Sequence, residues 1–259
     1  METQRRSLYP STLRPAASTA RIVDALDRWD RRLGSSYAQF VERRTVRVLG
    51  RTSTALFLTL LMAGKAIALR QLLSSDQPAT EDLSVWMTAL HHLLQTIFVG
   101  LVVLLVVFRR PARAGAARLT GVVAALAGTF ALSLLVLEGA GGLRADLTPL
   151  AVLLLLLGMG WAIWSLRTLG RCFSIVPEVR GLVTSGPYRW MRHPVYLGEM
   201  TAALGLLLPI LSTRNVVVFA LFCALQLWRT RYEEKGLAAT FPVYEEYRQR
   251  TARLLPGLW

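Results

Sequence analysis

Residues 147–166 read LTPLAVLLLLLGMGWAIWSL, a run of 20 residues without a charged side chain. A helix needs about 17 to 25 apolar residues to cross the hydrocarbon core of a bilayer, which is roughly 30 Å thick. This run is therefore long enough to span a membrane. Three further apolar runs precede it, at residues 54–73, 85–108 and 119–137. Two shorter runs follow it, at residues 195–211 and 216–228.

The six runs predict an all-α protein, a polytopic membrane bundle of about five to six transmembrane helices. Only residues 212–215 separate the last two runs, so we expect these runs to form a helical hairpin. At 1.5 Å per residue the final run covers about 20 Å, less than a bilayer, unless its helix continues through Arg229. The sequence leaves open whether this hairpin reaches the far surface.

The composition argues against a soluble enzyme. Of 259 residues, 53% are hydrophobic and only 18% are charged, and the mean hydropathy is +0.42. The 30 Lys and Arg residues outnumber the 16 Asp and Glu residues, which gives a net charge of +14. In a soluble chain such an excess would point to nucleic acid. The positions of the basic residues must decide between nucleic acid and membrane.

The basic residues alternate along the chain with the apolar runs. Residues 1–53 hold eleven Arg against five acidic residues, and the connections at 109–118 and 167–194 are also rich in Arg. The connection at 74–84 holds three acidic residues and no base. Positive residues collect on the cytoplasmic side of short loops. We therefore predict a multi-pass integral membrane protein with both termini in the cytoplasm, with membrane lipids and not nucleic acid as a partner.

The same pattern divides the chain into three regions. Residues 1–53 form a basic cytoplasmic segment in which apolar residues recur at helical spacing between Ile22 and Phe40, as in a helix lying in the membrane interface. Residues 54–166 form a region of four transmembrane helices. Residues 167–259 form a third region with a helical hairpin and a C-terminal helix. No metal site is predicted, because the adjacent His91 and His92 point about 100° apart on a helix.

The third region differs in composition from a simple loop. Residues 169–200 read LGRCFSIVPEVRGLVTSGPYRWMRHPVYLGEM, rich in Gly, Pro, Arg and aromatic residues. Backbone that is not helical beside a bilayer must be buried in protein or line a cavity. A helix that opens at Pro194 would leave free N–H groups, which suit a carboxylate or a phosphate.

A second polar stretch, RTRYEEKGLAATFPVYEEYRQR, follows at residues 229–250. Arg229 and Glu233 are four residues apart, and Arg231 and Glu234 are three apart. Glu233 and Glu234 diverge by about 100° on a helix, so at most one of them should point squarely into a shared site. Taken alone, this stretch is typical of a solvated helix with ion pairs worth about 0.3 to 0.5 kcal/mol each.

Taken together, the elements GPYRWMRHPVYLG (186–198) and RTRYEE (229–234) resemble a known family. They are similar to the integral-membrane methyltransferases related to isoprenylcysteine carboxyl methyltransferase and phospholipid N-methyltransferase. The resemblance covers roughly residues 166–256, and the first four apolar runs carry no matching motif. In that family these elements form a cytoplasmic pocket for S-adenosylmethionine under the C-terminal helix.

The resemblance implies an S-adenosylmethionine-dependent methyltransferase with a lipophilic or lipidated acceptor that enters from the inner leaflet. It implies cofactor-binding roles for Tyr188, Arg192, His193, Pro194, Tyr196, Gly198, Glu233 and Glu234. Arg231 is expected to steer an anionic acceptor, and Glu233 to hold the acceptor or the cofactor. A neutral amine acceptor would need a base, for which Glu199 is the nearby candidate. The acceptor and the oligomeric state stay open.

Two other readings remain open. Membrane sterol reductases, which bind NADPH, share a similar C-terminal arrangement, but their histidine is typically followed by Asn, whereas His193 here precedes Pro194. A non-enzymatic membrane scaffold is the third reading. The chain lacks the repeated pattern of broken helices that marks many transporters.

Overall fold

The computed structural model describes residues 44–74, 83–110, 112, 123, 127–128, 144–175 and 178–256. The longer helices are α2 (Arg44–Ser74), α3 (Leu83–Phe108), α5 (Thr148–Leu169), α6 (Pro194–Leu207), α7 (Thr213–Thr240) and α8 (Tyr244–Arg250). Within these residues no strand occurs, and an isolated β-bridge pairs Met191 with Ala252. The predicted all-α class is therefore confirmed. The predicted interfacial helix at 22–40 and most of the run at 119–137 lie outside the described residues.

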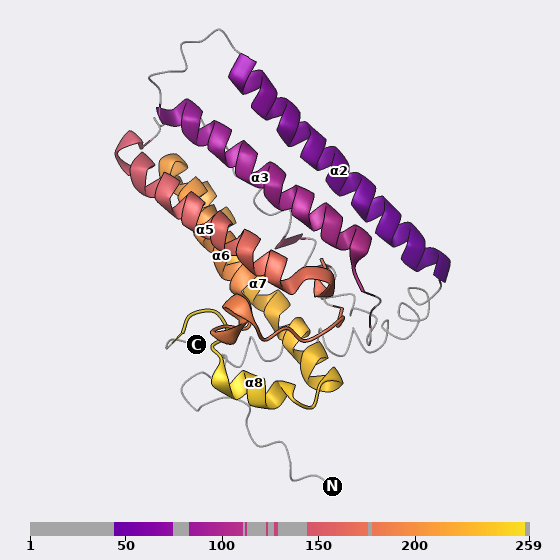
Figure 1. Cartoon of the computed structure of the whole chain (residues 1–259). Helices are drawn as coiled ribbons and strands as arrows, with labels where there is room; N and C mark the ends of the chain where they lie inside the picture. Colours follow the sequence, from indigo (N-terminus) through magenta and orange to yellow (C-terminus); the bar gives the residue numbers. More distant parts are fainter. Residues whose placement is uncertain are drawn as a thin grey trace.

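The long helices run side by side and share one polar end (Figure 1). α3 and α5 both run toward this end, where α2 and α6 begin and the second half of α7 lies. Backbone contacts tie the ends of α3 and α5 together, since the amide of Arg110 donates to the carbonyl of Arg171 at 2.9 Å. The fold thus places Arg110, Arg171 and the motif-bearing segments at the same end of the bundle.

One helix in the described part of the chain is long and apolar enough to cross a membrane, over Thr148–Cys172. The apolar stretches of three other helices, at 52–67, 92–108 and 194–210, are shorter. The prediction was five to six spans, and the described part of the chain holds one clear candidate and three shorter apolar helices.

α7 extends beyond the apolar run at 216–228, a continuation that the sequence left open. It begins after Ser212, whose hydroxyl accepts a hydrogen bond from the amide of Asn215 at 3.2 Å, a common N-terminal cap. It then continues without a break to Thr240, 28 residues in all, which corresponds to about 42 Å. The apolar run at 216–228 is only its first part. The second part carries Arg229, Glu233 and Glu234 beyond the apolar bundle.

α5 and α6 pack backbone against backbone through small residues. A Cβ atom added to Gly158 would lie 2.3 Å from the amide nitrogen of Ala202, and one added to Gly198 would lie 2.7 Å from the amide nitrogen of Ala162. Close approach through small residues is a usual way for helices to associate in membranes. This contact fixes the position of α6, and with it the side chains at the start of that helix.

Replacing Gly158 with alanine should therefore destabilise the protein by about 1 to 3 kcal/mol, the usual cost of forcing extra atoms into a packed contact. Gly160, two residues along α5, is the matched control, because nothing lies within 4 Å of a Cβ added there. Thermal unfolding in detergent measures the difference. Equal melting temperatures for the Gly158→Ala and Gly160→Ala variants would contradict the packing described here.

Candidate functional site

The candidate site lies where the chain enters α6, beside the second half of α7. The preceding segment is mostly not helical, and its short helix Gly186–Arg189 begins at a glycine with φ of 56°, a conformation that favours glycine. The C-terminal segment accepts hydrogen bonds from this backbone. The amides of Arg192 and His193 donate to the carbonyls of Ala252 (2.9 Å) and Arg253 (3.1 Å). The segment at 251–254 therefore closes one side of the site.

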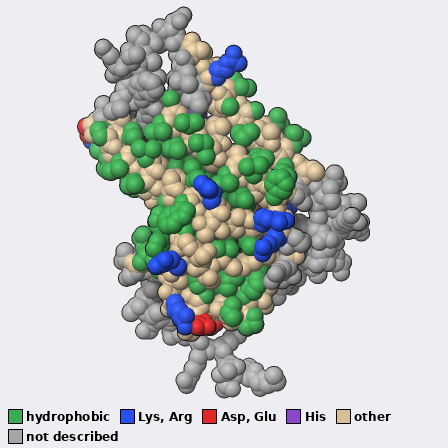
Figure 2. Space-filling model, in the orientation of Figure 1, with side chains coloured by type: hydrophobic (Ala, Val, Ile, Leu, Met, Phe, Trp, Pro, Cys, Tyr) green, Lys and Arg blue, Asp and Glu red, His purple; other side chains and the backbone are tan. Residues whose placement is uncertain are grey.

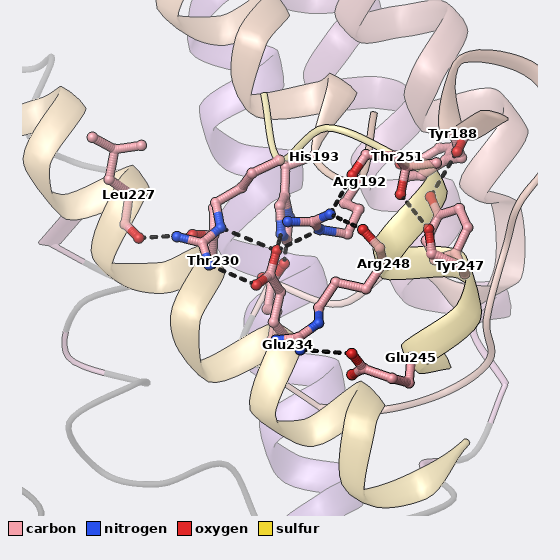
Figure 3. A network of polar contacts seen from close by, with 12 residues as sticks. Tyr188, Arg192, His193, Leu227, Thr230, Glu234, Glu245, Tyr247, Arg248 and Thr251 are labelled. Carbon is pink, nitrogen blue, oxygen red and sulfur yellow. Dashed lines mark hydrogen bonds and ion pairs between the residues drawn. The ribbon is translucent and has the colours of Figure 1, made fainter. Parts of the chain in front are cut away.

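Glu234 of α7 is the centre of a buried network of charges. Figure 3 shows Arg192 and His193, which lie just before α6, pointing toward it. Arg192 Nε donates to Glu234 Oε1 at 2.8 Å, and Arg253 Nη2 donates to Oε2 at 2.8 Å. His193 Nε2 lies 3.3 Å from Oε1. One carboxylate thus joins three basic side chains from two separate segments.

Burial alone would raise the pKa of Glu234, because it disfavours the charged form. The hydrogen bonds and charges of His193 and Arg253 outweigh that effect and hold the pKa of this carboxyl well below its usual range. Glu234 is therefore ionised at neutral pH. It serves as the shared anion of the network.

Arg192 also holds the C-terminal segment. Its Nη1 donates to the carbonyl of Arg248 at 2.8 Å and to that of Thr251. Tyr247 of α8 donates its hydroxyl to the carbonyl of Tyr188 at 2.6 Å, so a second bond joins α8 to the same loop (Figure 3). Burial raises the pKa of Tyr247 to about 12. Its hydroxyl therefore stays protonated and able to donate at neutral pH.

Glu233, the neighbouring carboxylate, has a different set of partners. Tyr196 donates its hydroxyl to Glu233 Oε1, and Arg229 Nε donates to the same oxygen at 3.0 Å. His193 Nδ1 lies 3.6 Å from Glu233 Oε2. The Glu233 side chain keeps 22% of its surface exposed, against 8% for Glu234. Glu233 is therefore the carboxylate of this pair that a ligand can reach.

Aromatic contacts fix the side chains around Glu233. The rings of His193 and Tyr196 stack with centroids 5.5 Å apart and planes 8° apart. The guanidinium of Arg229 lies 5.0 Å over the Tyr196 ring and also donates to the carbonyl of Ser174 at 3.2 Å. The cluster of His193, Tyr196, Arg229 and Glu233 therefore combines one accessible carboxylate, one buried cation and flat ring surfaces.

The structure brings together five of the predicted site residues, namely Arg192, His193, Tyr196, Glu233 and Glu234. Three others support the backbone around them. Tyr188 is buried in the loop, Pro194 is the first residue of α6, and Gly198 lies in the contact with α5. Burial raises the pKa of Tyr188, so its phenol is neutral. Its carbonyl, not its hydroxyl, makes the bond to α8.

Two details differ from the prediction. Glu233 and Glu234 were expected to diverge so that only one faced a common site, yet His193 lies between them and approaches one with each ring nitrogen. Arg231 is exposed, whereas Arg229 is buried and pairs with Glu233. On a helix, residues four apart share a face and residues two apart do not. The spacing of Arg229 and Glu233 was the signal for the inward-facing arginine.

The region that holds this cluster has relatives among known proteins. Residues 147–243 match the family model described as phospholipid methyltransferase. Residues 147–243, less than half of the chain, are thus similar to a methyltransferase family. The resemblance predicted from the sequence is thereby confirmed for α5, α6, α7 and the loop between them. The residues that follow, Arg248, Thr251 and Arg253, lie beyond the methyltransferase-family region and nevertheless complete its charge network.

Individual relatives align with just under half of the chain. It is 38% identical over 123 residues to the cobalt-zinc-cadmium resistance protein CzcN of Cupriavidus metallidurans, covering 46% of this chain and 56% of that protein. It is 33% identical over 120 residues to the protein-S-isoprenylcysteine O-methyltransferase of Saccharomyces cerevisiae, covering 42% and 48%. The aligned part thus spans about half the length of these relatives.

Among solved structures, the eukaryotic intramembrane Ras methyltransferase, an isoprenylcysteine carboxyl methyltransferase, aligns over 91% of this chain and 94% of its own. The TM-score is 0.47 and the sequence identity is 15%.

Proposed function

We propose that this chain is a membrane methyltransferase that uses S-adenosylmethionine and methylates a lipophilic acceptor. The observation that carries the proposal is the cluster of His193, Tyr196, Arg229 and Glu233 inside the methyltransferase-family region. The name of the yeast relative, an isoprenylcysteine O-methyltransferase, supports the reaction class.

The residues of the cluster fit the chemical groups of this cofactor. S-Adenosylmethionine carries a ribose diol, which suits a partly exposed carboxylate such as Glu233. Its adenine suits the flat surfaces of His193 and Tyr196. Its own carboxylate suits the first turn of α6, a helix of 14 residues whose N-terminal amides face the loop. Arg192 and Glu234 bind each other, and in this proposal their ion pair joins the loop before α6 to α7 on one side of the site.

In the mechanism that we propose, the cofactor supplies a methyl group on a sulfonium and a thioether leaving group. The protein's part is placement, which can contribute several kcal/mol when reacting atoms are held about 3 to 3.5 Å apart. Glu233 orients the cofactor, and Arg229 and Tyr196 fix Glu233. The closed segment at 251–254 keeps water from one side of the site. Arg231 stays on the exposed face of α7, where it would act on an anionic acceptor approaching from outside the cluster.

The proposal includes an integral, multi-pass position in a membrane with both termini in the cytoplasm. Large apolar side chains are exposed on α2, α3, α5 and the first part of α7, which suits a lipid environment. Figure 2 shows hydrophobic side chains spread over the visible face of the protein. Past Leu221, the exposed side chains of α7 include Arg231 and Lys235. Exposed Arg110 and Arg171 lie at the same end as the site, which the positive-inside rule assigns to the cytoplasm. The division into regions 1–53, 54–166 and 167–259 is part of this proposal.

Titration of the detergent-solubilised protein with S-adenosylhomocysteine and, separately, with NADPH tests the proposal by calorimetry. Binding of S-adenosylhomocysteine without binding of NADPH is the expected result. Binding of NADPH alone would favour a reductase of the sterol-reductase type. Binding of neither would point to a non-enzymatic scaffold and overturn the proposal.

A further inference from the structure

Three tryptophan side chains form a cluster between α5 and the loop that leads into α6. Trp161 and Trp164 lie in the second half of α5, and Trp190 comes two residues before Arg192. The Trp190 ring stacks on Trp161 with centroids 6.2 Å apart, and it meets Trp164 edge to face at 6.1 Å. Trp161 and Trp164 contact each other at 5.3 Å. Each ring therefore touches the other two, which fixes the loop against α5.

This cluster lies at the protein surface, since Trp164 and Trp190 are 44% and 43% exposed. An indole combines a large apolar ring with one polar N–H group, so tryptophan is enriched where apolar and aqueous surroundings meet, as at the surface of a bilayer. α5 runs toward the polar end of the bundle (Figure 1). The two exposed rings therefore lie toward the end that the proposed orientation places at the cytoplasmic surface of the membrane.

Two exposed arginines flank the exposed rings. Arg167 follows Trp164 by three residues on α5, so these two side chains share a face of the helix. The guanidinium of Arg189 lies 5.0 Å from the centre of the Trp190 ring. Neither arginine forms an ion pair with a described residue. We call these four exposed residues the Trp/Arg patch: Trp164, Arg167, Arg189 and Trp190.

An exposed apolar stripe of α5 leads to this patch. Exposed residues recur along α5 every three or four positions and so share one face, in the order Leu150, Leu153, Leu157, Gly160, Trp164 and Arg167. Nothing lies within 4 Å of a Cβ atom added to Gly160, so the stripe has open space one turn before Trp164. The stripe changes from aliphatic side chains to an indole and then to a cation. A phospholipid changes in the same order from acyl chain to head group.

We propose that the Trp/Arg patch binds the head group of an anionic phospholipid, with an acyl chain of this lipid along the exposed stripe of α5. The phosphate of such a lipid complements the charges of Arg167 and Arg189, and lipids of the cytoplasmic leaflet supply it. A zwitterionic lipid carries its own cation and neutralises the patch less. The inference rests on the membrane position in the proposed function and does not involve the methyl transfer.

A bound lipid would also support the candidate site. Trp190 lies in the loop that carries Arg192 and His193 into the charge network. A head group that contacts Arg167 on α5 and Arg189 in the loop would link these two elements from outside. The lipid would therefore stabilise the loop against α5 on the side that faces the membrane.

Brominated acyl chains quench tryptophan fluorescence on contact, so they report which lipid lies beside the patch. The full chain is reconstituted in two vesicle preparations with the same mixture of phosphatidylcholine and phosphatidylglycerol, one with bromine on the first lipid and one with bromine on the second. We expect phosphatidylglycerol to be favoured beside the quenched tryptophans by at least about fivefold. This ratio corresponds to the roughly 1 kcal/mol that a basic residue contributes near an anionic lipid surface.

Substitutions assign this preference to the patch. The double change Trp164→Phe and Trp190→Phe should remove the quenching that favours phosphatidylglycerol, whereas Trp228→Phe on α7 should keep it. The double change Arg167→Gln and Arg189→Gln should bring the preference close to equality. Arg250→Gln makes the same chemical change on the exposed face of α8 and should leave the preference within about twofold of wild type.

Three results would overturn the lipid site in a protein that stays embedded in the vesicles. They are equal quenching by the two lipids, a preference that survives the double arginine change, and lipid-selective quenching that survives the double tryptophan change. Absence of quenching at the patch would indicate that a second copy of the chain covers it and would also overturn the site. Extraction of the protein from the vesicles by alkaline carbonate would instead overturn the proposed membrane position, and the lipid site with it.

Discussion

Replacement of Glu234 by alanine is expected to lower the free energy of unfolding by about 3 to 5 kcal/mol, the usual cost of removing one partner from a buried ion network. The change leaves Arg192, Arg253 and His193 without their shared anion in a site where the Glu234 side chain is only 8% exposed. Thermal unfolding followed by circular dichroism in detergent measures the loss. The C-terminal segment should also become sensitive to protease.

Glu246→Ala is the matched control, because the ion pair between Glu246 and Arg250 lies on the exposed face of α8 with both side chains more than 60% exposed. Solvent screens such pairs, and their loss changes stability by less than about 1 kcal/mol. Acid provides an independent check. The folded-state pKa of Glu234 is depressed, so its contribution is present above its ordinary pKa of 4.5 and is lost as the pH falls below that value. A Glu234→Ala variant as stable as Glu246→Ala would contradict the network.

Replacement of Glu233 by alanine is expected to weaken binding of S-adenosylhomocysteine by about 10- to 100-fold, since hydrogen bonds to a charged group contribute about 1.5 to 3 kcal/mol. Stability should change less than in Glu234→Ala, because Glu233 is partly exposed and its partner Arg229 keeps its bond to the carbonyl of Ser174. Calorimetric titration of the variant and of wild type gives the ratio. His193→Ala should weaken binding as well.

Arg231→Ala is the control for this experiment, because Arg231 is exposed on the same helix. Its affinity for S-adenosylhomocysteine should equal that of wild type. Unchanged affinity in both Glu233→Ala and His193→Ala would overturn the assignment of the cofactor site. If Arg231→Ala loses as much affinity for S-adenosylhomocysteine as Glu233→Ala, Arg231 contributes to the cofactor site.

The sequence predicted the helical class and the residues that meet at the start of α6, because both depend on local patterns. The apolar runs predicted where the helices lie, and the motif around His193 and Pro194 predicted which residues meet at the candidate site. The choice between Arg229 and Arg231 depended on which face of α7 turns inward. The family resemblance favoured Arg231, whereas the four-residue spacing of Arg229 and Glu233 was the signal for Arg229. The helix continues to Thr240, and the phase of that continuation buries Arg229.

Other parts of the site depend on contacts distant in sequence. Arg253 reaches Glu234 across 19 residues, and Arg192 reaches the carbonyl of Thr251 across 59. No spacing rule relates these positions, and Thr251 and Arg253 belong to no motif. The role of Gly198 likewise depends on how closely α5 approaches α6, which a motif alone does not specify.

The pairing of residues 251–254 with the loop before α6 has a consequence for the order of assembly. Arg192 leaves the ribosome 61 positions before Arg253, so the helices that carry the site are made before the segment that neutralises and covers it. When Arg192 and Glu234 have been made, the segment at 251–254 that covers that side of the site is therefore still missing. The site can close on this side only after residues 251–254 have been made, so a change that displaces them would uncover the site without altering a residue of α5, α6 or α7.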